Sequence, residues 1–224
     1  MSSFDPLKPP SPASPMRSLS REAAASGDYE SVVIADMRLW LERAVIGLNL
    51  CPFAKSVHVK EQVHYVVSDA RDPQVLRAHL VRELRALHAA DPAVRDTTLL
   101  MAPFLFSEFL DFNDFLAEAE DALAELGLEG ELQIASFHPD FLFAGTDASD
   151  VTNYTNRAPY PTLHLLREAS IDRAVDAYPQ AETIYERNMK ILQEMGVKGW
   201  EALGIRNRLR ENERDDPDSA QERR

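Results

Sequence analysis

The sequence predicts an α/β fold, in which helices flank a small, mainly parallel sheet of three to four strands. Short β-branched and aromatic runs alternate along the chain with longer segments whose apolar residues recur every three or four positions. Each connection between successive strands has room for one crossover helix, as parallel neighbours require. A ferredoxin-like α+β fold is the alternative, and it would need an additional hairpin strand near Phe104–Phe106.

The first half of the folded region supplies two helices and two strands. A helix is expected after Asp28, a suitable N-cap, and before Pro52, because a proline disfavours helical torsions in the residue that precedes it. Val63–Val67 is predicted to be a strand, and the Asp-Pro pair at 72–73 begins a second helix. The nearly continuous apolar run over 97–102 is typical of a central strand that is buried on both faces.

The second half adds a strand and several helices. Asp111 is expected to cap a third helix that ends at Gly127, and Leu132–Phe137 to form a third strand. Phe141–Ala144 can fold back as a short fourth strand. The remaining apolar periodicity predicts helices over about 161–177 and 181–195, followed by a short helical piece at 200–203.

The chain divides into one globular region and two tails. Residues 1–27 are rich in proline and serine, and residues 206–224 alternate arginine with acids and contain almost no apolar side chains. Segments of these compositions cannot bury enough surface to offset chain entropy, so both are predicted to be disordered. Residues 28–205 are predicted to form a single α/β domain.

Composition excludes several classes of function. The 224 residues carry 24 Lys plus Arg and 37 Asp plus Glu, a net charge of −13 that disfavours binding to nucleic acid or to an anionic membrane surface. No apolar stretch approaches the roughly 20 residues of a membrane span. Without a secretory signal, the protein is expected in the cytoplasm. The pattern specifies no oligomeric state.

Cys51 is the only cysteine, which excludes an internal disulfide and a zinc site of several thiolates. It follows the end of the first predicted helix, where the helix dipole raises the pKa of a thiol. We therefore expect a packing residue rather than a nucleophile, unless Arg157 or a histidine approaches it in space.

One segment differs from a plain scaffold. About twenty residues between the third strand and the following predicted helix are rich in Asp, Asn, Thr, Tyr and Pro, and this loop is long for a compact domain. It begins where the third strand ends, and open α/β sheets bind ligands beyond the carboxyl ends of their strands. The loop is therefore the predicted functional site.

Several motifs also follow one another in a familiar order. They lie at Leu48–Lys55, Thr97–Pro103, Asp111–Leu116, Gln133–Gly145 and Asn153–Glu168. With these segments the chain resembles the DUF1415 family of bacterial proteins over roughly residues 29–196. It departs from the family pattern at Ala158, where a serine is expected, and at Phe141-Leu142, where a Tyr-Gln-like pair is expected. The family has no known function, so the resemblance implies no mechanism.

Two histidines and one glutamate, His138, His164 and Glu168, are the candidate catalytic residues. His138 lies at the predicted strand exit and can act as acid, base or metal ligand, or simply bond its own turn. His164 and Glu168 are four residues apart and would share one face of the helix predicted over 161–177. That pair can bind a divalent metal or orient an imidazole, or it can be an ordinary helix pair. No strong metal motif is present, so the metal ligands stay unassigned.

Polar residues of the same loop are the candidate substrate-binding groups. The guanidinium of Arg157 can hold a carboxylate or phosphate, or it can pair with Asp147 or Asp150 to pin the loop. Asn153 and Asn156 suit substrate orientation or turn closure equally.

These observations support two hypotheses. The first is a soluble enzyme for a small anionic substrate, in which His138 provides acid–base chemistry or binds a metal and Arg157 binds the anion. The second is a binding or assembly module without chemistry, in which the 138–168 loop is a brace or a partner surface.

Overall fold

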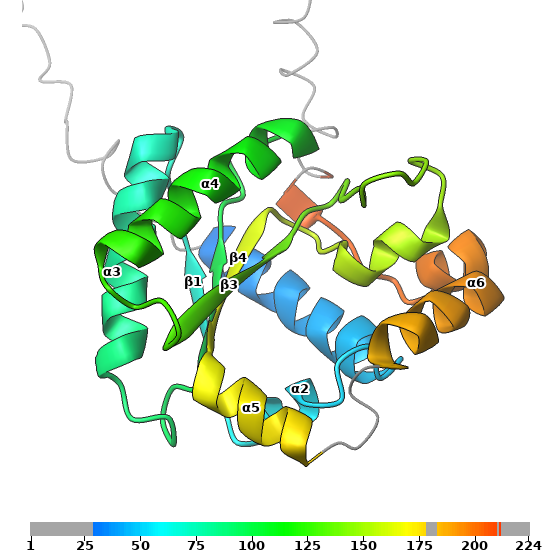
Figure 1. Ribbon diagram of the computed structural model, residues 1–224. Coiled ribbons are helices and arrows are strands. Elements are labelled where there is room, and N and C mark those ends of the chain that lie inside the picture. Colours follow the sequence, from blue (N-terminus) through cyan, green and yellow to red (C-terminus); the bar gives the residue numbers. More distant parts are fainter. Residues whose placement is uncertain (1–28, 178–182, 210, 212–224) are drawn as a thin grey trace, which may run out of the picture.

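The computed structural model describes residues 29–177, 183–209 and 211 (Figure 1). The predicted tail 1–27 lies outside these residues, as does the predicted tail 206–224 except for 206–209 and 211. The first described residues, 29–40, form a helix that continues as a π-helical turn, η1. The elements then follow in the order η1 (Leu41–Ile46), α2 (Ala54–Val59), β1 (Val63–Val67), α3 (Pro73–Ala89), β2 (Thr97–Met101), α4 (Phe109–Glu125), β3 (Leu132–Phe137), η2 (Val151–Asn156), β4 (Thr162–Arg167), α5 (Glu168–Asp176) and α6 (Ile184–Ala202).

The four strands form one mixed sheet in the order β1-β2-β4-β3. β1 and β2 are parallel, whereas β4 is antiparallel to both of its neighbours. The α/β class is confirmed, but the sheet is not mainly parallel. After β3 the chain makes no helical crossover. It returns through the long loop and enters the sheet as β4, between β2 and β3.

Two predicted elements are wrong around this fourth strand. The segment 162–167 is a strand and not the first half of a helix, which begins only at Glu168. Phe141–Ala144 forms no strand. The ferredoxin-like alternative is also excluded, because 104–106 forms no strand and Phe106 has a φ of 58°.

The observed helix boundaries agree with the predicted cap at Asp72 and differ from those predicted at Asp111 and Gly196. The Asp72 carboxylate caps α3, since its Oδ1 accepts a hydrogen bond from the Gln74 amide at 2.8 Å. The predicted cap Asp111 lies inside α4, which starts two residues earlier. The predicted helix end at Gly196 is a kink with a φ of 64°, beyond which α6 continues to Ala202.

The sheet separates two apolar layers (Figure 1). Helices α3 and α4 cover one face, where the core contains the leucines of α3 with Phe112, Phe115, Leu100, Leu163 and Leu165. The helix over 29–46 covers part of the other face, with Met37 and Trp40 packed against Leu99 and Met101. All five residues of β2 are buried, as the sequence predicts for a central strand.

A buried polar contact fastens the end of the described chain to the first helix. Asp36 is 2% exposed, and its Oδ2 accepts hydrogen bonds from the Tyr160 hydroxyl at 2.7 Å and from the Arg208 amide at 3.0 Å. The Arg208 guanidinium pairs with Oδ1 at 2.5 Å. Because an unpaired buried carboxylate is costly, these donors hold 29–46, β4 and the C-terminal segment together.

Candidate functional site

His138 is enclosed by the fold and hydrogen-bonded at both ring nitrogens. It is fully buried between the rings of Phe109 and Phe112. Its Nδ1 accepts a hydrogen bond from the Asp140 amide at 3.0 Å, so Nε2 carries the proton and donates to the Phe106 carbonyl at 2.9 Å. Both ring nitrogens are thereby occupied, and the contact stabilises Phe106 in its left-handed conformation. The geometry gives no support to acid–base chemistry at His138.

Arg157 also braces the loop. Its Nε donates to the Phe141 carbonyl at 3.3 Å, its Nη2 donates to the Ala148 carbonyl at 3.0 Å, and the guanidinium lies 4.4 Å from the centre of the Tyr154 ring. The acids considered as its partners close turns instead. Hydrogen bonds from Ser149 and Thr152 lower the pKa of Asp147 and Asp150, respectively.

The two asparagines close turns. Asn153 is fully buried, and its Oδ1 accepts hydrogen bonds from the Phe143 amide and the Thr146 hydroxyl, while Nδ2 donates to the Asp147 carbonyl. Asn156 donates from Nδ2 to the Ser136 carbonyl at 3.2 Å. Among the alternatives left open by the sequence, the geometry favours turn closure for both residues.

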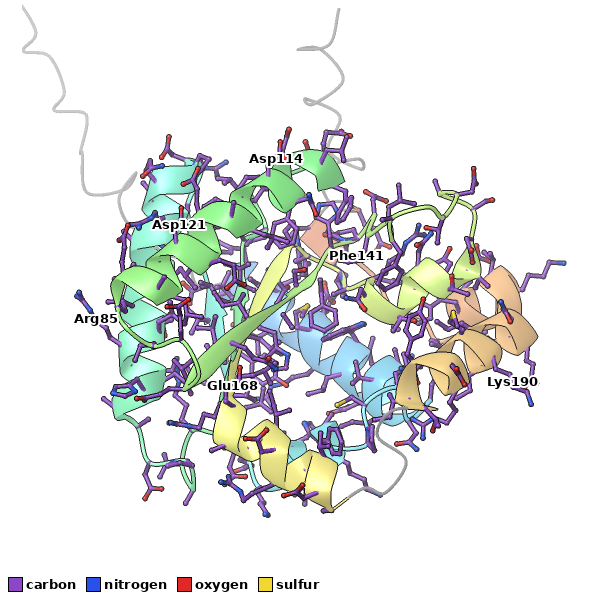
Figure 2. All side chains as sticks on the ribbon, viewed as in Figure 1. Arg85, Asp114, Asp121, Phe141, Glu168 and Lys190 are labelled. Atoms are coloured by element: carbon purple, nitrogen blue, oxygen red, sulfur yellow. The ribbon has the colours of Figure 1, made fainter. Side chains whose placement is uncertain are left out.

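The predicted convergence of catalytic groups does not occur. His138 packs against α4, whereas His164 lies on the opposite face of the sheet, 6.1 Å from the Phe137 ring. Glu168 is the first residue of α5 and lies at the junction with β4 (Figure 2), so it does not share a helix face with His164. The long loop is an internally bonded brace, and the two histidines occupy separate environments.

A different site is present on the sheet face that the first helix leaves uncovered. There a cavity of about 820 Å³ lies between the sheet, η1, the segment 51–60 and α5, and we call it the α2–α5 cavity. Its walls are mostly apolar and include Trp40, Leu41, Val45, Phe53, Leu99, Phe137, Leu166, Ile171 and Ala174. The wider π-helical turn contributes two of these side chains, and such turns occur often at functional sites.

His164 is the central polar group on the floor of this cavity. It lies in β4, with Leu99 and Ala135 as its neighbours in the adjacent strands. Its Nε2 is 2.7 Å from the Thr97 hydroxyl, which donates its single proton to the Leu165 carbonyl, also at 2.7 Å. Thr97 must therefore accept the proton of His164 Nε2, and the imidazole has its lone pair at Nδ1.

The free nitrogen of His164 faces the cavity. No hydrogen bond to Nδ1 occurs within the described part of the chain, and this atom is not among its buried polar atoms that lack a partner. Burial lowers the pKa of the imidazole to about 4. At neutral pH His164 is therefore an uncharged ring with one available acceptor.

Gln133 provides a second polar group on the floor. It lies on β3, opposite Leu166 in the sheet register, and lines the cavity two residues before Ala135. Its side-chain amide has no hydrogen bond to another described residue. Because Ala135 is small, the space beside His164 and Gln133 stays open.

Cys51 lies in the cavity wall and is not part of the packed core. Burial raises the pKa of its thiol, while the amides of Phe53 and Ala54 and the charge of Arg187 lower it by smaller amounts. The thiol therefore stays protonated at neutral pH. The raised pKa agrees with the expectation that Cys51 is not a thiolate nucleophile. Its main cause is burial of the thiol rather than a helix dipole.

Three charged side chains lie at the cavity end formed by α5 and the residues before β2. The Ser170 hydroxyl donates to Asp96 Oδ1 at 2.6 Å and accepts a hydrogen bond from the Arg173 guanidinium at 2.9 Å. Lys60, which follows α2, also lines the cavity, and the side-chain amide of nearby Gln62 donates to the Pro92 and Ala93 carbonyls, which come shortly before Asp96. We call Lys60, Asp96 and Arg173 the cavity mouth.

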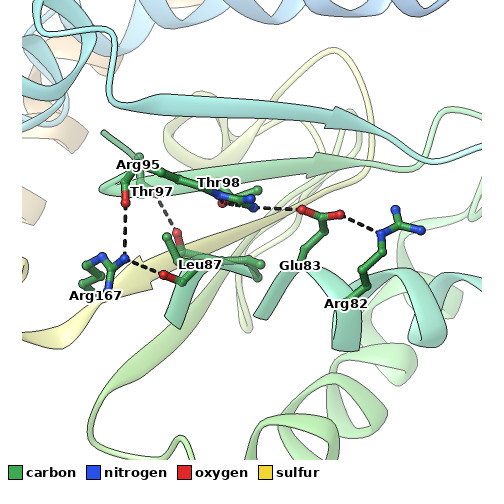
Figure 3. Close-up of polar contacts among 8 residues, drawn as sticks. Arg82, Glu83, Leu87, Arg95, Thr97, Thr98 and Arg167 are labelled. Atoms are coloured by element: carbon green, nitrogen blue, oxygen red, sulfur yellow. Dashed lines mark hydrogen bonds and ion pairs between the residues drawn. The ribbon is translucent and has the colours of Figure 1, made fainter. Parts of the chain in front are cut away.

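Arg167 borders the cavity but directs its side chain elsewhere. Figure 3 shows its guanidinium turned toward Leu87 of α3. Nη2 donates to the carbonyls of Leu87 and Ala90. Arg95 lies in the same network and pairs with Glu83 at 2.8 Å. The guanidinium of Arg167 thus bonds carbonyl groups at the C-terminal end of α3. It is not directed toward the mouth and is not one of the mouth's cations.

The cavity has no strong signature in the sequence. Its polar floor residues are single members of three different strands, and Gln133 and His164 each lie between apolar neighbours in the sequence. The one local signal is parity, since Thr97 and Leu99, or Gln133 and Ala135, are two residues apart and must share a face. Which polar residues meet depends on β4 pairing with both β2 and β3.

The described residues contain no group of three or more His, Cys, Asp or Glu side chains placed to hold a metal ion. None of the helices in the described ranges has both the length and the apolar character of a membrane span.

Comparison with known proteins gives one match. A search of curated proteins and a search of solved structures found nothing similar. A family model described as a protein of unknown function, DUF1415, matches residues 32–202, which is well over half of the chain and includes most of the cavity lining. The chain therefore belongs to the DUF1415 family.

Proposed function

We propose that this protein binds a small, largely apolar organic molecule in the α2–α5 cavity, with His164 as the acceptor that recognises a hydroxyl or N–H group of the ligand. The observation that carries the proposal is the neutral imidazole of His164, whose Nε2 proton is committed to Thr97 and whose Nδ1 has no partner among the described residues.

The dimensions and lining of the cavity support a small ligand. Sites for small molecules usually enclose about 300–1,000 Å³ and combine apolar walls with a few polar groups that fix orientation. The α2–α5 cavity has this volume, and its polar groups on the floor are Thr97, Gln133 and His164. An uncommitted acceptor in an apolar site favours ligands that supply a donor, since a buried polar group without a partner costs about 1–3 kcal/mol.

The electrostatics favour binding over nucleophilic catalysis. A cysteine–histidine enzyme needs a thiolate beside a basic or protonated imidazole. In this cavity burial raises the pKa of the Cys51 thiol and lowers the pKa of the His164 imidazole. Each shift is opposite to the one that such an enzyme needs. Both side chains are therefore uncharged at neutral pH.

The test is a thermal-shift screen of apolar alcohols, amides and acids, with Trp40 fluorescence as a second signal because this side chain lines the cavity. We expect ligands that raise the melting temperature and that bind about fivefold more weakly to His164→Leu. His64→Leu is the matched control, because His64 is an exposed histidine of the same sheet.

Ala135→Leu gives an independent test of location. The larger side chain fills the space beside His164 and should abolish binding of the same ligands. Ligands that bind the wild-type protein and the Ala135→Leu variant equally would contradict the proposal, because they would occupy another site.

We further propose that the protein acts in the cytoplasm of a bacterial cell. A single cysteine whose thiol is free suits a reducing compartment. Fractionation of cells that express the full chain, followed by immunodetection, tests this assignment.

A further inference from the structure

The distribution of charge along the α2–α5 cavity indicates which class of molecule it accepts. This step rests on the proposed function and concerns the two ends of the cavity. One end is apolar and is formed by Trp40 and Phe137, whose rings are 5.1 Å apart. The other end is the mouth, with two cations and one acid in a chain of net charge −13.

The cations of the mouth are not neutralised by ion pairs. Neither Lys60 nor Arg173 has a carboxylate within 4.0 Å among the described residues, whereas Arg77 and Arg95 each have one. The single acid, Asp96, accepts the proton of Ser170, and Ser170 in turn accepts from Arg173. This chain of hydrogen bonds orients the Arg173 guanidinium and leaves its other donors available.

The strand register gives the distance between the mouth and the polar floor. His164 and Arg167 are three residues apart in β4, which corresponds to about 10 Å. The mouth lies beyond Arg167, because α5 begins at Glu168 and Asp96 immediately precedes β2. A ligand that reaches from the mouth to His164 therefore spans about 10 Å and passes Leu166, which lies in register between Thr97 and Gln133.

We propose that the ligand is an amphipathic organic acid of about 10 Å, whose carboxylate lies at Lys60 and Arg173 and whose far end carries a hydroxyl that donates to His164 Nδ1. The carboxylate pairs with cations that have no other acid, and the hydroxyl supplies the proton that the imidazole lacks. The carbon chain between them removes its surface and that of the cavity wall from water.

Four compounds of equal chain length separate the two polar contributions. They are 8-hydroxyoctanoate, octanoate, 1,8-octanediol and octanol, which combine a carboxylate or a hydroxymethyl end with a distal hydroxyl or methyl end. We expect 8-hydroxyoctanoate to bind most tightly. Each polar end should contribute about three- to fivefold in affinity, the range for a solvent-accessible ion pair and for one hydrogen bond.

Variants assign each contribution to its residue. Lys60→Gln and Arg173→Gln should each weaken the two acids about threefold and leave octanol unchanged, and added salt should reduce the difference. His164→Leu should weaken the compounds with a distal hydroxyl. Lys190→Gln is the charge-matched control, since Lys190 extends outward from α6 (Figure 2) and does not line the cavity.

Calorimetry with the full chain decides between the outcomes. Preference for 8-hydroxyoctanoate that is lost in the Lys60 and Arg173 variants confirms the inference. Equal affinity for 1,8-octanediol and 8-hydroxyoctanoate overturns it and leaves the proposed function intact. Binding of none of the four compounds overturns the inference as well. In that case, Nile red that binds the wild-type protein and not Ala135→Leu would show that the cavity still accepts apolar molecules.

Discussion

Replacement of Thr97 by valine tests the arrangement at the centre of the cavity. Thr97 is 5% exposed, and its hydroxyl connects two groups, as acceptor for His164 Nε2–H and as donor to the Leu165 carbonyl. Valine has nearly the same shape but no hydroxyl, so the imidazole loses the contact that selects its tautomer. Leaving one enclosed polar group without a partner costs about 1–3 kcal/mol, and we expect a loss of unfolding free energy in that range.

The tautomer of His164 tests the arrangement more directly than the unfolding free energy does. In the wild-type protein, long-range ¹H–¹⁵N correlation spectra at neutral pH should show His164 protonated at Nε2 only. In Thr97→Val the same spectra should show a mixture of tautomers, because neither nitrogen then has a fixed partner. Ligands that donate to Nδ1 should bind more weakly to the variant, in proportion to the population of the wrong tautomer.

Thr98→Val is the matched control. Thr98 is the next residue of β2, and its hydroxyl bonds Arg95 on the opposite face of the sheet. Arg95 keeps its ion pair with Glu83, so we expect a smaller loss of stability and an unchanged His164 spectrum. A wild-type His164 that is protonated at Nδ1, or a tautomer that Thr97→Val leaves unaltered, would refute the reasoning.

Three further predictions concern stability. The pKa of His164 is about 4 in the folded protein and 6.5 in the unfolded chain, so the unfolded chain binds the proton first as the pH falls. The stability contributed by the neutral ring is therefore fully present above pH 6.5, and roughly 3 kcal/mol of it is lost between pH 6.5 and pH 4. Urea titrations should show a flatter pH dependence of the unfolding free energy for His164→Gln. Tyr160→Phe should cost about 1–3 kcal/mol in chemical denaturation, since buried Asp36 loses a donor, whereas Tyr185→Phe on the surface should cost little. His138→Leu should lower the melting temperature strongly, because the Phe106 carbonyl and the Asp140 amide lose their partner. Protein that still folds should keep its ligand affinity.

Most of the scaffold could be predicted from local patterns. The first helix, three strands and the helices between them carry clear periodicity, and α3 is capped as the Asp-Pro pair indicates. β4 could not be found in this way. Pro161 precedes it and Glu168 follows it, which resembles a helix start, and its alternation of leucine with His164 is too short to exclude a helix. Only its pairing with two other strands makes it a strand.

The side chains of the predicted site bond within the loop and its surroundings for a related reason. A long polar loop indicates function when its side chains are free, but a loop that packs against the body must also satisfy its own buried backbone groups. Asn153 and Arg157 provide hydrogen bonds to carbonyls and amides of that loop, and His138 bonds the turn at Phe106. The sequence contains the residue types for either use, and it does not show which atoms they meet.

The separate roles of the two histidines follow from strand parity. Residues of a strand alternate between its faces, so Phe137 and His138 must point in opposite directions, and Phe137 lies on the cavity side. His138 is therefore directed into the aromatic cluster of α4, where both nitrogens find partners. His164 pairs with Ala135 in register, on the same face as Phe137 and beneath no covering helix. A shift of β4 by one residue would place a leucine at the cavity floor and an imidazole in the apolar core. The register of one inserted strand thus determines that His164, and not His138, lines the α2–α5 cavity.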